Sequence, residues 1–242
     1  MKFPEGPTDL AQVDSTEFDA KLLGENELGS VHIHGPFGDA TSEIRIAYLI
    51  GMHPLESKSH RALFDRLTSK TDLKYCYYLY NINVNDSKSE SEGRDEGQLL
   101  AQEFVAPHII NEKYDLFLDI HSNRGSHGPG DYQITNFVFA PGFDDESSKY
   151  MNEIIDSIDG VIYYAPEFRS SPPYITEPTS KAGIATIVYE CYSFEPMEVT
   201  CELAEKLVKT VDNLEFFLKK LNLRKYFFSK LKMRLLMQQL MV

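Results

Sequence analysis

The sequence has 242 residues, and its 24 basic and 37 acidic side chains give a formal net charge of −13 at pH 7. So acidic a balance argues against nucleic acid and against an anionic membrane surface as general partners, although it permits a local basic pocket. Hydrophobic residues make up 42% of the chain and charged residues 25%, which is typical of a globular domain large enough to bury a substantial core.

The cysteines and the N-terminal segment bear on the compartment. Cys76, Cys191 and Cys201 show no Cys-x-x-Cys spacing and indicate no disulfide framework. The first seven residues lack the apolar core of a signal peptide, and no apolar run approaches the length of a transmembrane helix. We therefore expect a cytoplasmic protein.

The first strand expected along the chain carries two histidines. Residues 1–29 are polar and interrupted by Pro and Gly, with a short amphipathic piece over 18–23, and residues 30–35 then alternate like a strand with His32 and His34 on one face. A His-x-His strand is also the first metal motif of amidohydrolases. That alternative needs later histidines at the strand ends of a barrel, and no histidine follows His127. A half-exposed strand is the favoured interpretation.

The next apolar run, over residues 44–50, predicts a buried strand that stops at Gly51. His53 and Glu56 follow three residues apart, before a polar segment over 57–70 that is typical of a helix. An imidazole and a carboxylate at this spacing can hold one metal ion from the same side. A lone His-x-x-Glu pair is common by chance, so the pattern needs a third ligand from a distant segment.

Two further apolar strands end in polar side chains that could complete such a site. Residues 114–120 lead into His121, and residues 185–190 end in Glu190. A carboxylate at the end of so apolar a strand is unusual unless it has a partner or a task. Because open α/β sheets place their sites at strand ends, we expect these side chains to meet.

The remaining elements alternate between strands and helices. Strands are expected over 74–80, 136–140 and 161–164, and helices over 96–110, 144–158 and 198–221. The first of these helices should turn five apolar residues toward the sheet: Leu99, Leu100, Phe104, Val105 and Ile109. Long loops are expected over 81–95, 122–131 and 165–182. The first of them contains Gly93 and Arg94 near its end.

This alternation predicts one α/β domain with a mixed, mostly parallel sheet and helices on both faces. The domain should cover residues 1–221. Residues 222–242 contain five basic and no acidic side chains beside apolar residues, which indicates a basic amphipathic tail. Such a tail can bind a partner or a membrane surface, and a terminal packing helix is an equally good interpretation.

Taken in order, these residues resemble a known family. His53-x-x-Glu56, His121 after Leu118-Asp119-Ile120, and Glu190 at the end of the apolar run from Ala182 are similar to the zinc carboxypeptidase superfamily. The closer likeness is to its aspartoacylase and succinylglutamate desuccinylase branch. The resemblance covers roughly residues 44–190 and depends on the order and context of the motifs.

The resemblance implies a zinc carboxypeptidase-like fold and hydrolysis of an amide in an N-acyl amino acid or at a peptide end. One zinc ion per chain would be held by His53, Glu56 and His121. Glu190 would take the proton of the attacking water, and Arg94 would face the developing oxyanion. Asp119 shares a strand face with His121 and could orient its imidazole.

The sequence departs from the family in its expected carboxylate-binding pair. Many members carry adjacent Asn and Arg between the second and third ligands, whereas the only such dipeptide here, Asn123-Arg124, follows His121. We still expect a locally positive pocket for a small anionic substrate, with Arg124, Arg169, Tyr174 and Lys181 as substrate-binding candidates. The alternative is a metal-free member that only binds a small ligand.

Overall fold

The computed structural model describes residues 12–14, 20–70, 72–127, 133–142, 144–167 and 169–216. The expected basic tail over 222–242 lies outside these residues, so the division into a domain and a tail stays a prediction. The last helix, expected over 198–221, ends at Asn213, and residues 214–216 are not helical. Within the described ranges, no helix is long and apolar enough to cross a membrane.

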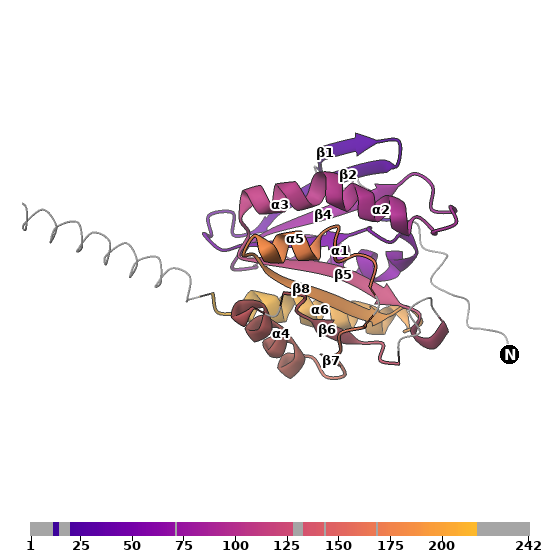
Figure 1. Cartoon of the computed structure of the whole chain (residues 1–242). Helices are drawn as coiled ribbons and strands as arrows, with labels where there is room; N and C mark the ends of the chain where they lie inside the picture. Colours follow the sequence, from indigo (N-terminus) through magenta and orange to yellow (C-terminus); the bar gives the residue numbers. More distant parts are fainter. Residues whose placement is uncertain are drawn as a thin grey trace, which may run out of the picture.

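Eight strands among the described residues form one sheet in the order β1-β2-β4-β3-β5-β8-β6-β7 (Figure 1). The central strands β4, β3, β5 and β8 run parallel to one another, whereas β2 and β6 join them antiparallel. The strand bounds are β1 Lys21–Asn26, β2 Gly29–Gly38, β3 Arg45–Ile50, β4 Cys76–Val84, β5 Leu116–Asn123, β6 Phe137–Phe139, β7 Ile162–Tyr163 and β8 Ala185–Tyr192. The mixed, mostly parallel sheet is thereby confirmed. The described strands β1 and β7 stand at opposite edges of the sheet and do not pair with each other. The sheet is therefore not the closed barrel that the amidohydrolase alternative requires.

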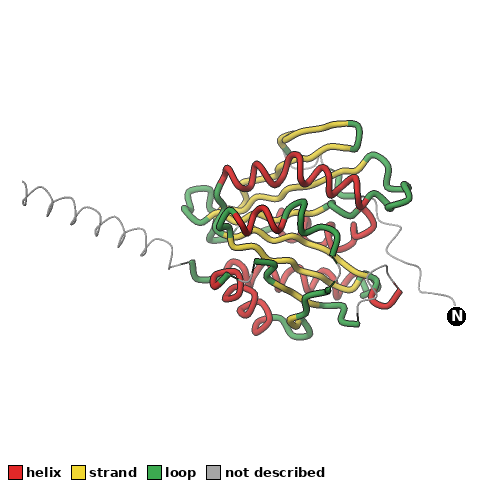
Figure 2. The backbone as a smooth tube through the Cα atoms, in the orientation of Figure 1, coloured by secondary structure: helices red, strands yellow, loops and turns green. Residues whose placement is uncertain are grey.

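Helices cover the sheet on both faces, as predicted (Figure 2). Side chains alternate along each strand, so Ile46, Tyr48 and Ile50 of β3 enter one core and Ala47 and Leu49 the other. The first core also contains apolar residues of α1 (Ser57–Ser69), α4 (Asp145–Ser157) and α6 (Met197–Asn213). The second contains residues from α2 (Arg94–Leu100) and α3 (Ala106–Glu112), and Ile175 and Ile184 on either side of α5 (Thr176–Lys181).

One expected helix differs from its apolar pattern. Between α2 and α3, the segment η3 (Ala101–Val105) is a π-helix. Its wider turns shift the buried face, and Pro107 just beyond it supplies no backbone N–H for a regular ladder. Leu100, Val105 and Ile109 are buried, but Leu99 is 43% exposed. The prediction that Leu99 faces the sheet is therefore wrong.

Several segments expected as loops are regular structure. β4 continues to Val84 and β5 to Asn123, because their polar ends still pair with neighbouring strands. β1 forms in the N-terminal segment expected to be irregular, and α5 forms inside the expected loop over 165–182. The extension of β5 matters most, since it makes Ser122 and Asn123 part of the rigid sheet.

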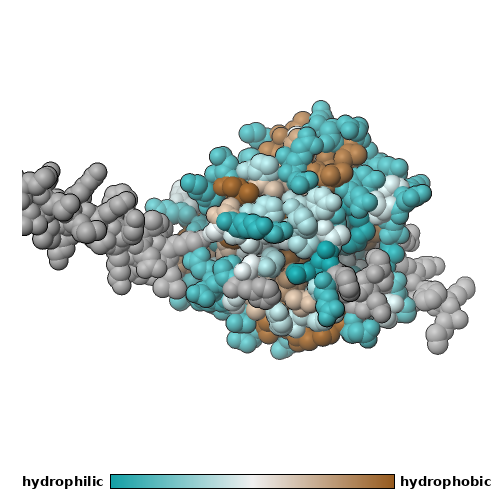
Figure 3. All heavy atoms as spheres, viewed as in Figure 1, coloured by the Kyte–Doolittle hydropathy of each residue, from teal (hydrophilic) through white to brown (hydrophobic). Residues whose placement is uncertain are grey.

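The face drawn in Figure 3 is largely hydrophilic, with a few small apolar patches. The exposed large apolar side chains of the described residues are dispersed over β1, α2, β7 and the start of α6: Leu22, Leu99, Ile162, Tyr163 and Val199. Apolar residues exposed singly or in pairs are ordinary on a protein surface and by themselves indicate no partner.

Candidate metal centre

The candidate site lies at the carboxyl ends of three neighbouring parallel strands, β3, β5 and β8. The pairing of β5 with β8 sets His121 directly opposite Glu190. Gly51 ends β3 with φ of 84°, and a Cβ there would lie 2.0 Å from the Ile82 carbonyl oxygen. Only glycine fits this left-handed turn against β4, and the turn brings His53 and the short helix η2 (Pro54–Glu56) over the end of β5.

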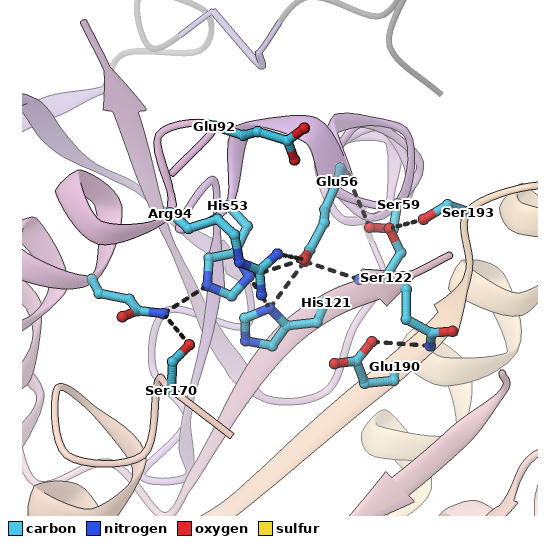
Figure 4. A network of polar contacts seen from close by, with 12 residues as sticks. His53, Glu56, Ser59, Glu92, Arg94, His121, Ser122, Ser170, Glu190 and Ser193 are labelled. Atoms are coloured by element: carbon cyan, nitrogen blue, oxygen red, sulfur yellow. Dashed lines mark hydrogen bonds and ion pairs between the residues drawn. The ribbon is translucent and has the colours of Figure 1, made fainter. Parts of the chain in front are cut away.

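His53, Glu56 and His121 converge there, and one potential ligand atom from each lies within 4.8 Å of the others. Nδ1 of His53 is 2.9 Å from Glu56 Oε1, Nδ1 of His121 is 3.0 Å from Glu56 Oε2, and the two Nδ1 atoms are 3.1 Å apart (Figure 4). All three residues are almost completely buried. No other such cluster of metal-ligating side chains occurs among the described residues.

The surroundings of His121 fit a metal ion. A carboxylate oxygen of Asp119 lies 3.0 Å from its Nε2, and in the part of the chain that is described neither Nε2 nor either Asp119 oxygen has a hydrogen-bond partner. A buried carboxylate at Nε2 favours the tautomer that carries its proton there, which leaves the Nδ1 lone pair directed at Glu56. Two imidazole nitrogens and one carboxylate form a donor set suited to a divalent cation such as zinc.

Burial and the neighbouring charges act in opposite directions on the pKa values of this cluster. Burial alone would lower the pKa of His121, but Asp119 and Glu56 together raise it well above the ordinary value. Burial lowers the pKa of His53 to about 4, against the opposing attraction of Glu56. The pKa of Glu56 is held well below its usual range by His53 and His121, despite its burial. A cation at this position therefore satisfies carboxylates that burial would otherwise penalise.

Glu190 is the third buried carboxyl group of the site, after Glu56 and Asp119. It is 8% exposed, and its Oε2 accepts a hydrogen bond from Asn123 Nδ2 at 3.2 Å. Burial raises the pKa of Glu190 to about 8, with Glu56 adding to the rise and His121 and Asn123 opposing it. The side chain is held beside the His53–Glu56–His121 cluster, in a carboxyl form that can exchange a proton near neutral pH.

Arg94 and Gln98 reach the cluster from one face of α2. Nη1 of Arg94 is 3.2 Å from Glu56 Oε1. Nε2 of Gln98 lies 3.2 Å from His53 Nε2 and donates to Ser170 Oγ at 2.8 Å. Gly97 permits this approach, because a Cβ there would lie 1.9 Å from the Met52 carbonyl oxygen. Sequence reasoning missed Gln98, although its spacing of four from Arg94 is the signal for a shared helix face.

The other substrate-binding candidates lie in different places. Arg124 pairs with Glu92 at 3.4 Å, and Figure 4 draws Glu92 above the cluster. Arg169 is exposed, with its guanidinium 4.7 Å from the ring centre of Phe139, and it adjoins the Ser170 that contacts Gln98. Tyr174 is half-buried in the turn that begins at Ser171.

Lys181 is not brought to this cluster. It ends α5, pairs with Glu177 and is 73% exposed. It precedes the amino end of β8, whereas Glu190 is near the carboxyl end of that strand. His32 and His34 also lie apart from the cluster, on β2, which is separated from β3 by β4.

Solved structures with a similar backbone include metallopeptidases. The metallo-carboxypeptidase of Burkholderia cenocepacia superposes with a TM-score of 0.52 and 14% identity, over 82% of this chain and 65% of that one. The cell shape determinant protein Csd4 of Helicobacter pylori, in its apo form, gives 0.54 and 11%, over 76% and 54%. A provisionally named metallopeptidase of Shewanella denitrificans gives 0.50 and 13%, over 79% and 82%.

No family model and no curated protein matches the sequence. The chain spans 60% and 65% of the length of the first two metallo-carboxypeptidases with which it aligns. At such low identities the likeness concerns the backbone alone. The chain has the fold of the metallo-carboxypeptidases, which confirms the fold that the resemblance implied.

Proposed function

We propose that the protein is a zinc-dependent hydrolase that cleaves the amide bond of an N-acyl amino acid or of a peptide end. The observation that carries this proposal is the buried convergence of His53, Glu56 and His121 beside Glu190 on the adjacent strand. The metallo-carboxypeptidase fold supports it. Both a carboxypeptidase and a deacylase of the aspartoacylase type remain within the proposal, since the two reactions need the same cleavage of a C–N bond.

In this proposal zinc would be held by Nδ1 of His53, Nδ1 of His121 and the carboxylate of Glu56, with Asp119 orienting His121. When bound, zinc would polarise the substrate carbonyl and lower the pKa of water to roughly 7. With zinc on Nδ1, Nε2 of His53 would carry the proton, so Gln98 would hold the ring by presenting its amide oxygen to Nε2.

Glu190 would act as general base and then as general acid. Its carboxylate would take the proton of the water as oxygen attacks the carbonyl carbon, and would return a proton to the nitrogen as the C–N bond breaks. A pKa of about 8 is close to the working pH, which suits a group that must both accept and release a proton. Asn123 would hold the carboxylate in position through its amide.

Arg94 would stabilise the oxyanion. Its side chain is 33% exposed and contacts the cluster only through Glu56 Oε1, so the guanidinium can turn toward a substrate oxygen. Arg124 and Arg169 would attract an anionic substrate, and Tyr174 would line the same side. Lys181 is left out of this role, because it lies at the other end of β8.

The experiment that tests the proposal measures zinc and hydrolysis on the same purified protein. We expect about one zinc per chain, with hydrolysis of an N-acyl amino acid or a small peptide that is lost on chelation and restored by zinc. A folded protein that takes up no zinc would contradict the proposal. Zinc-independent binding of the same small compounds would support the metal-free binding protein instead.

A further inference from the structure

His60 occupies a buried position between the two segments that carry the histidines of the metal centre. It lies in the first turn of α1 and is 2% exposed. Its Nδ1 accepts a hydrogen bond from the Gly51 N–H at 3.3 Å, and its Nε2 lies 3.1 Å from the Ile120 carbonyl oxygen. Gly51 precedes His53 by two residues, and Ile120 directly precedes His121.

These two partners fix the state of the imidazole. A backbone N–H can only donate and a carbonyl oxygen can only accept, so Nδ1 must be unprotonated and Nε2 must carry the proton. The ring is therefore neutral. Burial, the largest influence, lowers the pKa of His60 to about 4, with Glu56 opposing and His121 assisting, which agrees with a neutral ring at pH 7.

The two hydrogen bonds of His60 lie where the pairing between β3 and β5 stops. The paired residues of β3 and β5 end with Leu49 opposite Asp119. Beyond that pair the two strands continue toward His53 and His121 without further pairing to each other. The ring of His60 joins them at this point, with one hydrogen bond to each strand.

We propose that His60 is a positioning residue of the metal centre, whose imidazole sets the separation of His53 and His121 by tying Gly51 to Ile120. This inference rests on the proposed function, because it presupposes that those histidines bind a metal. Both hydrogen bonds of His60 go to backbone atoms and none to a ligand side chain among the described residues, so its positioning effect would be carried by the backbone. Partners that hydrogen-bond metal ligands directly change metal affinity about 10–100-fold when substituted, and we take this range as the expectation for His60.

Three variants separate the two hydrogen bonds. His60→Asn places an amide oxygen near the position of Nδ1, where it can still accept from Gly51. His60→Gln places an amide nitrogen near the position of Nε2, where it can still donate to Ile120. His60→Leu keeps the volume and loses both bonds. Leu67→Ala is the matched control. Leu67 is fully buried on the same helix, about two turns after His60.

The test measures zinc affinity by competition with a chelating dye, and the free energy of unfolding of each chelated protein. We expect His60→Leu to weaken zinc binding about 10–100-fold and the Asn and Gln variants to weaken it less. Leu67→Ala should lower stability and leave zinc affinity unchanged. Amide hydrogen exchange at Gly51 should accelerate in His60→Gln and stay slow in His60→Asn.

Each alternative outcome has a distinct meaning. Zinc affinity that stays at the wild-type value in all three His60 variants would overturn the inference, because His60 would then serve stability only. The Asn and Gln variants keep this test valid if His60→Leu does not fold. Failure of the wild-type protein itself to bind zinc would overturn the proposed function, and the inference with it.

Discussion

Among the seven histidines of the sequence, the pair His53 and His121 forms a candidate metal centre in the described structure, whereas the pair His32 and His34 does not. His32 and His34 are close in sequence on β2, yet His34 packs against Phe64 and no metal-ligating cluster of the described residues includes either. His53 and His121 are 68 residues apart, and their Nδ1 atoms are 3.1 Å apart. The difference is the setting: two parallel strands end side by side there, and Glu56 and Asp119 contribute carboxylates. Shared edges of a sheet, rather than proximity along the chain, assemble such a site.

The strongest way to break this comparison is to remove a ligand. His121→Ala should lose most of the zinc and reduce hydrolysis to background, because the site retains only one imidazole. Elemental analysis of the purified variant measures the zinc. Thermal unfolding checks that the variant folds, and full zinc occupancy in a folded variant would show that the ligand set is wrong.

Glu190→Gln should separate chemistry from metal binding. Gln nearly matches the volume of Glu but cannot accept a proton, so turnover should fall about 10²–10⁴-fold. Zinc content should hardly change, since Glu190 is not a proposed ligand. The matched control is Glu177→Gln on α5, which should keep full turnover. Unimpaired turnover in a folded, zinc-loaded Glu190→Gln protein would exclude Glu190 as the base.

A smaller effect is expected from the basic residues that are proposed to attract an anionic substrate. Arg124→Met should lower kcat/KM about tenfold for a substrate with a free carboxylate and leave its carboxamide analogue unaffected, because a charged hydrogen bond is lost only with the former. Lys181→Met should change neither, given its position at the far end of β8. Equal rates for the two substrates in the wild-type protein would contradict a positive pocket.

The buried His60 predicts a dependence of stability on pH. The folded protein keeps His60 neutral down to a pKa of about 4, whereas its ordinary value is 6.5. Between these values the unfolded chain binds one more proton, so stability contributed by this residue falls as pH decreases. Compared with His60→Asn, the chelated wild-type protein should lose up to about 1.4 kcal/mol more per pH unit in this window. Parallel denaturation curves from pH 7 to 4 for both proteins would contradict this.

The smallest effect belongs to the other histidine pair. His32→Ala should leave the zinc content unchanged and shift the free energy of unfolding by less than about 1 kcal/mol. Denaturant unfolding and zinc analysis on one preparation provide both values. Loss of zinc from this variant would undo the distinction between the two pairs.

The sequence was sufficient to predict which strands carry the site, although β5 and β8 continue beyond His121 and Glu190. Parallel strands buried on both faces read as continuous apolar runs, and for that reason His53, His121 and Glu190 could be placed together before any coordinates. Other features depend on packing that no local pattern encodes. Two such features are the π-helix at 101–105 and the exposure of Leu99 just before it. The hydrogen bonds of Gln98 and His60 likewise join segments distant in sequence. The catalytic and binding roles themselves remain predictions.

The close packing at Gly97 suggests a sequence motif that can be used to search distant sequences for the same site. Because its missing side chain lets α2 rest on the Met52 carbonyl, a larger residue there would push α2 outward, and Arg94 and Gln98 with it. We therefore expect the motif Arg-x-x-Gly-Gln, placed between a His-x-x-Glu turn and the next strand-end histidine, to accompany this arrangement. In sequences that keep the histidines but carry a bulky residue at the glycine position, α2 should lie further from the metal centre. We expect such proteins to prefer different substrates.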